Sequence, residues 1–419
     1  MKRLKIKKKS IVIIVIFIIF VIGCFFTYNY VMKKINGDIS LLKLKVNGDK
    51  EIVLKYNEEY TDLGATAKYG NDDLTDTIET ENNLDTKKLG TYKYTYKIKY
   101  KSLEKEVERT IKVVDNQAPV IKLKGRDNVS IGLGGKYVEY GSSATDEYDG
   151  DLSSKVVVDS SSVDTNKAGT YKVIYSVEDL SGNKTAVERV VNVTEGKAEK
   201  IPVLNYHFFY KDETDICHES ICLQIDKFNE QLDYLKNNGY YTVTTEEFVN
   251  WMYNETELPE KSVFLTIDDG AFGTAKDRGN YLIPALEEHK MYATLFLITD
   301  WWPIEYYESD NLDVESHTHD LHYEYRKYCE HRSKVNCVPY NDLVNDLKKS
   351  IDVVKSTNAF CFPFYESTEQ SIKAVKEVGF KTAFVGGNRK ATRNDNKYKI
   401  PRYPIYDSTS LKTFISYIN

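Results

Sequence analysis

Two segments of the chain are rich in residue types that bind metals and move protons. Asp268 and Asp269 follow the apolar run 263–267 and precede a glycine. Segment 315–322, ESHTHDLH, holds three of the seven histidines of the chain. Two histidines and one carboxylate form a metal site that keeps positions open for water and substrate. Each motif alone also has an ordinary interpretation, as a strand-ending turn or a surface loop.

The spacing of these residues gives them different expected roles. His317 and His322 are five residues apart and would not share a helix face. They converge only if the segment is a loop, which leaves His319 outside the site. Because neighbouring strand residues point apart, one of Asp268 and Asp269 would bind the metal while the other takes a proton.

A single histidine, His207, ends the short apolar run 201–206. A lone histidine is more often structural than catalytic, so its meaning depends on the other two motifs. In the hydrolysis of an amide, a metal can activate water and polarise the carbonyl, and an acid must protonate the leaving amine. His207 is the candidate for that acid.

The elements that must position these residues alternate between strand and helix from about residue 200 onward. This alternation predicts an α/β domain of the distorted β/α-barrel kind, in which functional residues lie at the C-terminal ends of strands. The strand-like runs are 263–267, 291–300, 359–364 and 381–387, and the helical patterns are 225–240, 275–290, 343–355 and 368–379.

Four motifs, VLNYH (203–207), TIDDG (266–270), SHTHDLH (316–322) and CFPF (361–364), carry a family resemblance. Together they resemble the polysaccharide deacetylase family of metal-dependent de-N-acetylases (carbohydrate esterase family 4, NodB-homology domain), over residues 200–419. The five-residue histidine spacing and the early YH motif are similar to the branch that contains poly-N-acetylglucosamine deacetylases.

The resemblance implies a role for each matching residue. The implied ligands of a divalent metal are Asp269, His317 and His322. Asp268 would be the general base toward water, and His207 the general acid. Zn²⁺ suits two histidines and one aspartate, with Co²⁺, Ni²⁺, Mn²⁺ or Fe²⁺ as alternatives.

Further residues are expected to shape the substrate site. Phe364 matches the loop whose backbone N–H helps to hold the oxyanion, and Tyr365 stands where the family usually has glycine. Arg402 would orient the base or contact the substrate. Trp301 and Trp302 are candidates to stack on sugar rings, or are half-buried loop aromatics. The family's usual phenylalanine before the acidic pair is Ile267 here.

The first half of the chain contains an internal repeat. Segments 84–96 and 163–175 are identical at eight of thirteen positions, at an offset of 79, and 64–67 parallels 141–144 at an offset of 77. Short alternating runs with turn signals predict two all-β Ig-like sandwiches, over 41–115 and 116–195. These modules resemble bacterial surface Ig-like domains and are expected to act as spacers. We interpret the acidic stretch 146–151 as a solvated loop rather than a Ca²⁺ site.

Residues 1–35 combine a basic segment with a long apolar run. The run begins at residue 11 and is long enough to span a bilayer, and the basic flank would stay cytoplasmic. We expect an uncleaved single-pass anchor with the remainder extracellular, as on a Gram-positive-type surface. A cleaved signal peptide and a lipoprotein with Cys24 lipidated are the alternatives.

An extracellular location permits disulfides. Two local bridges, between Cys217 and Cys222 and between Cys329 and Cys337, are one pairing that the spacing allows, although the sequence does not fix it. This pairing leaves Cys361 as a buried thiol.

The charge of the chain limits the classes of molecule that it is expected to bind. A formal net charge of −6 excludes a chain-wide basic surface for nucleic acid. Eight of the 57 basic residues lie before residue 35, which leaves 49 basic against 63 acidic residues, a net charge of −14, in the remainder. We expect neutral sugars and aromatic stacking, not charge, to hold the substrate.

These observations predict a membrane-anchored, extracellular de-N-acetylase of N-acetylglucosamine units in an envelope polysaccharide, with peptidoglycan favoured. The alternatives are a poly-β-1,6-N-acetylglucosamine deacetylase, an O-acetyl esterase, and a non-catalytic glycan-binding surface protein.

Overall fold

The structure is a computed structural model that describes residues 8–211, 220–270, 273 and 280–419. The chain forms two compact units. The first contains the residues up to Val120 with Thr145–Leu152 and Glu178–Lys184. The second contains Ile121–Ala144, Ser153–Val177 and Thr185–Asn419.

The N-terminal apolar run forms one long helix, α1 (Lys8–Asn36). Its segment Val12–Asn36 reaches a mean hydropathy of 2.6 and is not covered by the rest of the chain. By length and composition this helix could cross a membrane. It ends where Gly37 adopts a φ of +89°, a conformation that glycine accepts without steric cost.

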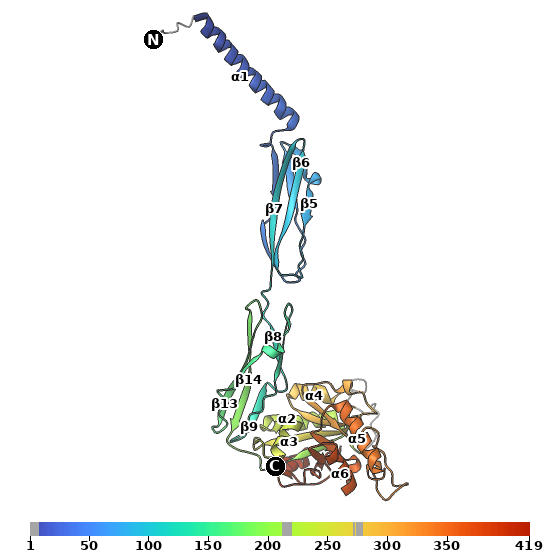
Figure 1. Ribbon diagram of the computed structural model, residues 1–419. Helices are drawn as coiled ribbons and strands as arrows, with labels where there is room; N and C mark the ends of the chain where they lie inside the picture. Colours follow the sequence, from blue (N-terminus) through green and yellow to red (C-terminus); the bar gives the residue numbers. More distant parts are fainter. Residues whose placement is uncertain (1–7, 212–219, 271–272, 274–279) are drawn as a thin grey trace. The chain divides into compact units, whose positions relative to one another are not determined.

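The first repeat is a sandwich of two sheets, as predicted. One sheet has the order β1-β3-β4 and the other β2-β7-β6-β5. Figure 1 shows the long hairpin of β6 and β7 running through this sandwich. The inward side chains of alternating strand positions, such as Ala67 and Ile98, pack between the sheets. The strands are β1 (Leu42–Val46), β2 (Glu51–Lys55), β3 (Ala65–Tyr69), β4 (Asp72–Asp73), β5 (Glu79–Asn82), β6 (Gly90–Tyr100) and β7 (Leu103–Val114).

The second repeat has the same strand order. Its sheets are β11-β10-β8 and β12-β13-β14-β9, so each strand has a counterpart in the first repeat. This agreement confirms the internal repeat as a repeat of structure. The strands are β8 (Val120–Leu123), β9 (Asn128–Gly132), β10 (Ser142–Asp146), β11 (Gly150–Asp151), β12 (Val157–Asp159), β13 (Gly169–Glu178) and β14 (Lys184–Thr194).

A buried arginine organises each sandwich. In the first repeat, Arg109 is fully buried, pairs with Asp62 and donates to the Tyr60 hydroxyl at 2.9 Å. In the second repeat, Arg189 is also fully buried and lies 3.0 Å from Glu139 and 2.6 Å from the Tyr175 hydroxyl. A buried charge is tolerated only when it is fully paired, so these networks belong to the cores of the sandwiches.

The second repeat packs directly on the C-terminal domain, within the same compact unit. Arg126 is 4% exposed and lies 3.2 Å from Glu247, on helix α3 (Thr245–Met252). Its guanidinium lies between the rings of Tyr241 and Tyr292, 4.4 Å and 3.8 Å from their centres. The Tyr140 hydroxyl also donates to Glu247, at 2.8 Å. A charged pair held between aromatic rings therefore joins the two domains.

Backbone contact reinforces this junction. The amide of Gly132 donates to the carbonyl of Glu257 at 2.9 Å. A Cβ atom at Gly132 would meet the carbonyl oxygen of Leu258 at 2.6 Å, and one at Gly135 would meet the backbone of Glu257 at 2.8 Å. The two backbones approach this closely because both positions are glycine.

The C-terminal domain is built on one curled, mainly parallel sheet. Its order is β24-β23-β22-β21-β20-β16-β26, with β19 paired to β20. The strands are β16 (Val203–Tyr206), β19 (Tyr241–Thr242), β20 (Ser262–Asp269), β21 (Ala293–Leu297), β22 (Leu312–Ser316), β23 (Ala359–Cys361), β24 (Thr382–Phe384) and β26 (Tyr403–Pro404). Every residue of β20 is buried, as expected for a central parallel strand.

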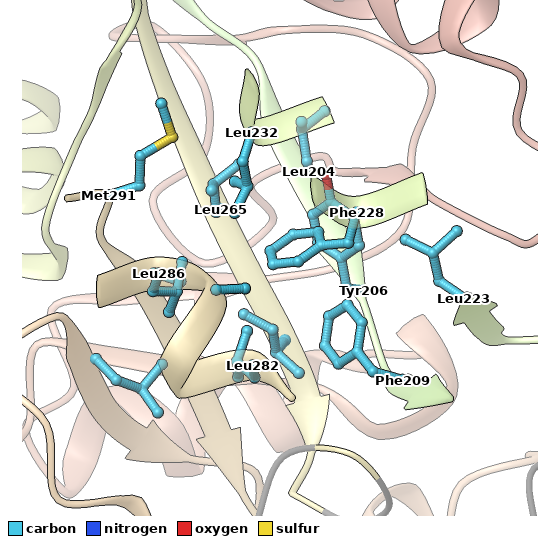
Figure 2. Close-up of a cluster of buried hydrophobic side chains, with 14 of the residues drawn as sticks. Leu204, Tyr206, Phe209, Leu223, Phe228, Leu232, Leu265, Leu282, Leu286 and Met291 are labelled. Carbon is cyan, nitrogen blue, oxygen red and sulfur yellow. The ribbon is translucent and has the colours of Figure 1, made fainter. Parts of the chain in front are cut away.

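Helices cover this sheet. The predicted helix 275–290 is shorter in the structure, where α4 begins at Leu282 and part of the predicted range lies outside the described residues. The helices are α2 (Ile225–Asn237), α3, α4 (Leu282–His289), α5 (Tyr340–Val354), α6 (Glu369–Glu377) and α7 (Leu411–Ile418). Figure 2 shows the core in which Leu204 and Leu265 from the strands meet Phe228 of α2 and Leu286 of α4.

Candidate active site

Three strand ends bring the chemical motifs together. His207 follows β16, Asp268 and Asp269 end β20, and His317 follows β22. The sheet order is β22-β21-β20-β16, and neighbouring strands are parallel, so these residues share one edge. They line a cleft of about 720 Å³. Its described lining residues are His207, Phe208, Ser220, Ile221, Asp268, Asp269, His317, His322, Arg332, Phe364, Tyr365, Tyr406 and Ser408.

One group in this cleft fits a divalent metal. The Asp269 carboxylate oxygen Oδ1 lies 3.3 Å from Nε2 of His317 and 3.2 Å from Nε2 of His322. This oxygen is buried and has no hydrogen-bond donor among the described residues. A buried carboxylate oxygen that faces two imidazole nitrogens is the donor set of an open metal site.

The orientation of His317 is fixed by its other ring nitrogen. Nδ1 lies 2.8 Å from the carbonyl oxygen of Cys361, so Nε2 points toward Asp269. A second ring nitrogen held by a backbone carbonyl is typical of metal-binding histidines. His319 turns away from this group and contacts the hydroxyl of Thr299 at 3.0 Å and the carboxylate of Asp300 at 3.4 Å.

Asp268 is held as an ionised carboxylate. Both of its oxygens accept hydrogen bonds from Arg402, each at 2.7 Å, and the guanidinium is fully buried. Burial alone would raise the pKa of Asp268, but the Arg402 charge outweighs it and lowers the pKa well below its usual range. The Cys361 thiol lies 3.4 Å from the same carboxylate. Asp268 is thereby fixed in place in its ionised form.

The two aspartates both face the cleft, unlike neighbours in a regular strand. Asp269 adopts a φ of +78°, and Gly270 follows at +83°. This left-handed turn at the end of β20 brings the second carboxylate to the same side as the first. A positive φ in a residue other than glycine costs energy and is found most often at functional sites.

The remaining predicted residues lie at different distances from this centre. His207 lines the cleft, with Nε2 4.0 Å from the Asp268 carboxylate. Phe364 stacks on the His322 ring with centres 4.8 Å apart. Trp301 is outside the cleft lining but lies edge-on to His322 at 5.7 Å, whereas Trp302 packs against the hydrophobic core.

The position where the family usually has glycine keeps a glycine-like backbone. Phe364 and Tyr365 have φ values of +57° and +61°. The Tyr365 hydroxyl donates to Oδ1 of Asn205 at 2.6 Å. A Cβ at Gly386 would lie 3.0 Å from the Tyr365 ring, so the ring packs where Gly386 leaves room. The tyrosine forms one wall of the cleft.

Sequence reasoning missed the loop after His322. The structure contains the bridge between Cys329 and Cys337, a pairing that the sequence left open, whereas Cys217 lies outside the described residues. The bridged loop places Arg332 in the cleft lining. The cysteine pair itself was the available signal, because it marks a loop rigid enough to hold a side chain.

Comparison with known proteins shows which families the chain matches. Residues 255–383 match the family model of polysaccharide deacetylases, and residues 44–113 and 121–193 match that of bacterial surface Ig-like domains. Residues 255–383 therefore form a polysaccharide deacetylase domain, which supports a hydrolase acting on carbon–nitrogen bonds, and two Ig-like domains precede it.

Individual relatives are distant. The chain is 26% identical over 227 residues to the poly-β-1,6-N-acetyl-D-glucosamine N-deacetylase of Staphylococcus aureus. The aligned region covers 48% of this chain and 73% of the relative. Among solved structures, it is similar to the Streptococcus pyogenes deacetylase PplD in complex with acetate, at 19% identity and a TM-score of 0.44, covering 52% of this chain and 98% of that chain. A polysaccharide deacetylase from Bacillus cereus has 17% identity and a TM-score of 0.43, covering 82% of this chain and 100% of that chain.

Proposed function

We propose that this protein removes acetyl groups from N-acetylglucosamine units of a cell-envelope polysaccharide, with peptidoglycan as the favoured substrate. The observation that carries the proposal is the pairing of Asp268 with Arg402 beside the group formed by Asp269, His317 and His322. A fixed base next to an open metal site is what amide hydrolysis requires. The S. aureus relative named above makes a poly-β-1,6-N-acetylglucosamine polymer the second candidate.

The residues divide the reaction between them. A divalent metal held by Asp269, His317 and His322 would lower the pKa of water and polarise the acetamide carbonyl. Asp268 takes the proton from the attacking water. His207 protonates the departing amine, which completes hydrolysis to acetate and a glucosamine.

The oxyanion that forms on the carbonyl needs a hydrogen-bond donor. The amide of Tyr365 donates to the carbonyl of Phe362 at 3.1 Å. Proline has no N–H, so Pro363 cannot donate. We therefore assign this role to the amide of Phe364, which lies in the left-handed turn beside His322.

We also propose that α1 anchors the enzyme in the cell membrane with the catalytic domain outside. The exposed apolar surface of the helix and the Ig-like domains support this placement. Protease digestion of intact cells tests it, because cleavage of the catalytic domain from outside is the expected result. The intact mass of the membrane form distinguishes the anchor from a lipoprotein, which would lack residues 1–23 and carry acyl groups on Cys24.

The catalytic proposal is tested by an Asp268→Asn variant of the full chain. Acetate release should fall by about 10²- to 10⁴-fold, because the base is lost, while bound metal measured by mass spectrometry stays unchanged. Asp310→Asn, at an exposed site, is the matched control and should keep wild-type activity. Full activity of Asp268→Asn would overturn the base assignment.

The substrate is tested with the wild-type enzyme on peptidoglycan, β-1,6-linked N-acetylglucosamine polymer and acetylxylan. Chelation should abolish acetate release, and Zn²⁺ or another divalent ion should restore it. Preference for acetylxylan would indicate an O-acetyl esterase. Metal-loaded protein that releases no acetate from any of the three would indicate a glycan-binding protein.

A further inference from the structure

The loop that follows His322 has a braced backbone and places Arg332 in the lining of the cleft. The amide of Tyr325 donates to the carbonyl of Arg332 at 2.6 Å, and the amide of Lys334 donates to the carbonyl of Tyr323 at 3.0 Å. The disulfide between Cys329 and Cys337 closes the loop. Arg332 therefore lies on a braced segment.

A carboxylate from the neighbouring strand end ties this loop to the catalytic sheet. Glu366 accepts hydrogen bonds from the amide of Ser333 at 2.9 Å and from the side chain of Asn336 at 3.3 Å. Glu366 follows directly after Phe364 and Tyr365, which line the cleft. Glu366 thus connects the loop to the turn formed by Phe364 and Tyr365.

The guanidinium of Arg332 is close to the reacting centre. It lies 4.7 Å from the centre of the Phe364 ring, and that ring stacks on His322. Its ion pair with Glu324 is long, at 3.7 Å, and the two side chains are 46% and 55% exposed. An exposed pair of this kind contributes little, so it leaves the guanidinium available to a ligand.

The two carboxylates of the cleft already have partners within the protein. Asp268 is matched by Arg402, and Asp269 faces two imidazoles. Among the described residues that line the cleft, Arg332 is the one lysine or arginine. The net charge of the chain predicts a substrate that is held without charge, but the cleft contains one local cation where the sugar chain must bind.

We propose that Arg332 recognises a carboxylate carried by the glycan beside the N-acetylglucosamine unit under attack. This assignment rests on the deacetylase function proposed above and names its substrate class as an acidic glycan. The planar guanidinium fork matches a carboxylate through two parallel hydrogen bonds. Peptidoglycan offers such groups on its stem peptides and on those lactyl ethers that carry no peptide, whereas a β-1,6-linked N-acetylglucosamine polymer is neutral.

The test compares two forms of one soluble glycan, N-acetylglucosamine–N-acetylmuramic acid oligomers with the lactyl carboxylate intact or reduced to an alcohol. Wild-type full chain should bind the acidic form at least about ten-fold more tightly, as measured by calorimetric titration. Arg332→Gln should lose this preference, raise KM for the acidic form by a similar factor and keep kcat. Binding of the reduced form should be unchanged.

The test includes a matched control variant and a measurement of binding that does not depend on turnover. Arg326 lies on the same loop, is exposed and is not among the cleft residues, so Arg326→Gln should behave like the wild type. Arg332→Gln that weakens both glycans equally, or neither, would overturn the proposal. Because titration does not need turnover, wild-type protein that binds the acidic form preferentially but releases no acetate would reject the deacetylase function and keep the carboxylate site.

Discussion

The two Ig-like repeats have the same interior and different surfaces. Arg109 and Arg189 occupy equivalent positions in their sandwiches, each paired with an acid and surrounded by tyrosine hydroxyls. At an offset of 77 residues, four positions of the second repeat that contact the catalytic domain have unlike counterparts in the first. The pairs are Asp49 and Arg126, Lys55 and Gly132, Glu58 and Gly135, and Leu63 and Tyr140.

This difference shows how one fold serves two purposes. The first-repeat members of these pairs are exposed, as on an ordinary sandwich surface. In the second repeat a buried cation and two glycines at the same positions create a docking face for the catalytic domain. The second repeat is therefore more than the spacer that its sequence predicts, because it forms part of the compact unit that carries the active site.

Of the substitutions that test this difference between the repeats, Arg126→Met should have the largest effect on stability. The substitution leaves Glu247 buried without its cation and should lower the free energy of unfolding by about 3–5 kcal/mol. All three tryptophans lie in the C-terminal domain, so their fluorescence during urea unfolding reports on this domain alone. Asp49→Met, at the equivalent exposed site, should change it by less than about 0.5 kcal/mol. Equal effects of the two substitutions would remove the distinction between the repeats.

A smaller loss of stability is expected when a bulky side chain pushes the second repeat and the catalytic domain apart at the same junction. Gly132→Val places side-chain atoms against the Leu258 carbonyl and should destabilise the catalytic domain by about 1–3 kcal/mol. Hydrogen exchange should increase at the amide of residue 132, which donates to the carbonyl of Glu257, and at the amide of Ala198, which donates to the carbonyl of Leu258. Lys55→Val is the counterpart in the first repeat. It should leave exchange in the catalytic domain unchanged, and increased exchange there would contradict the assignment.

Much of this architecture could be predicted from the sequence because its signals are local. The repeated GTY segments, the apolar runs and the motifs at their ends each lie within a few residues. The choice of His317 and His322 over His319 followed from the family resemblance of the local motif, and the structure places these two rings together with centres 4.7 Å apart.

Other features depend on contacts between distant parts of the chain or on backbone conformation. Asp268 and Arg402 are 134 residues apart, and only the fold shows that both carboxylate oxygens are occupied. The left-handed φ of Asp269 reverses the side that strand alternation predicts. Arg126 has no sequence signal of its own, because a lone charge in a loop usually faces solvent.

The smallest expected effect is a pH dependence of stability that arises from the arginine–acid pair present in both repeats. Burial alone would raise the pKa values of Asp62 and Glu139, but tyrosine hydrogen bonds and the paired arginines lower both below their usual values. An acid whose pKa is lowered in the folded state stabilises it above the unfolded-state pKa, near 4. This stability is lost as the pH falls through the lower, folded-state value.

Each repeat should therefore lose at most about 1 kcal/mol between pH 7 and pH 3 from this one group, since both acids are partly exposed. Hydrogen exchange of peptides from β6 and β13 measures the two repeats separately. Glu139→Gln should remove this part of the pH dependence from the second repeat and leave the first unchanged. If the variant retains the full pH dependence, the shared arginine network is not its source, and the repeats are alike in fold but not in what stabilises them.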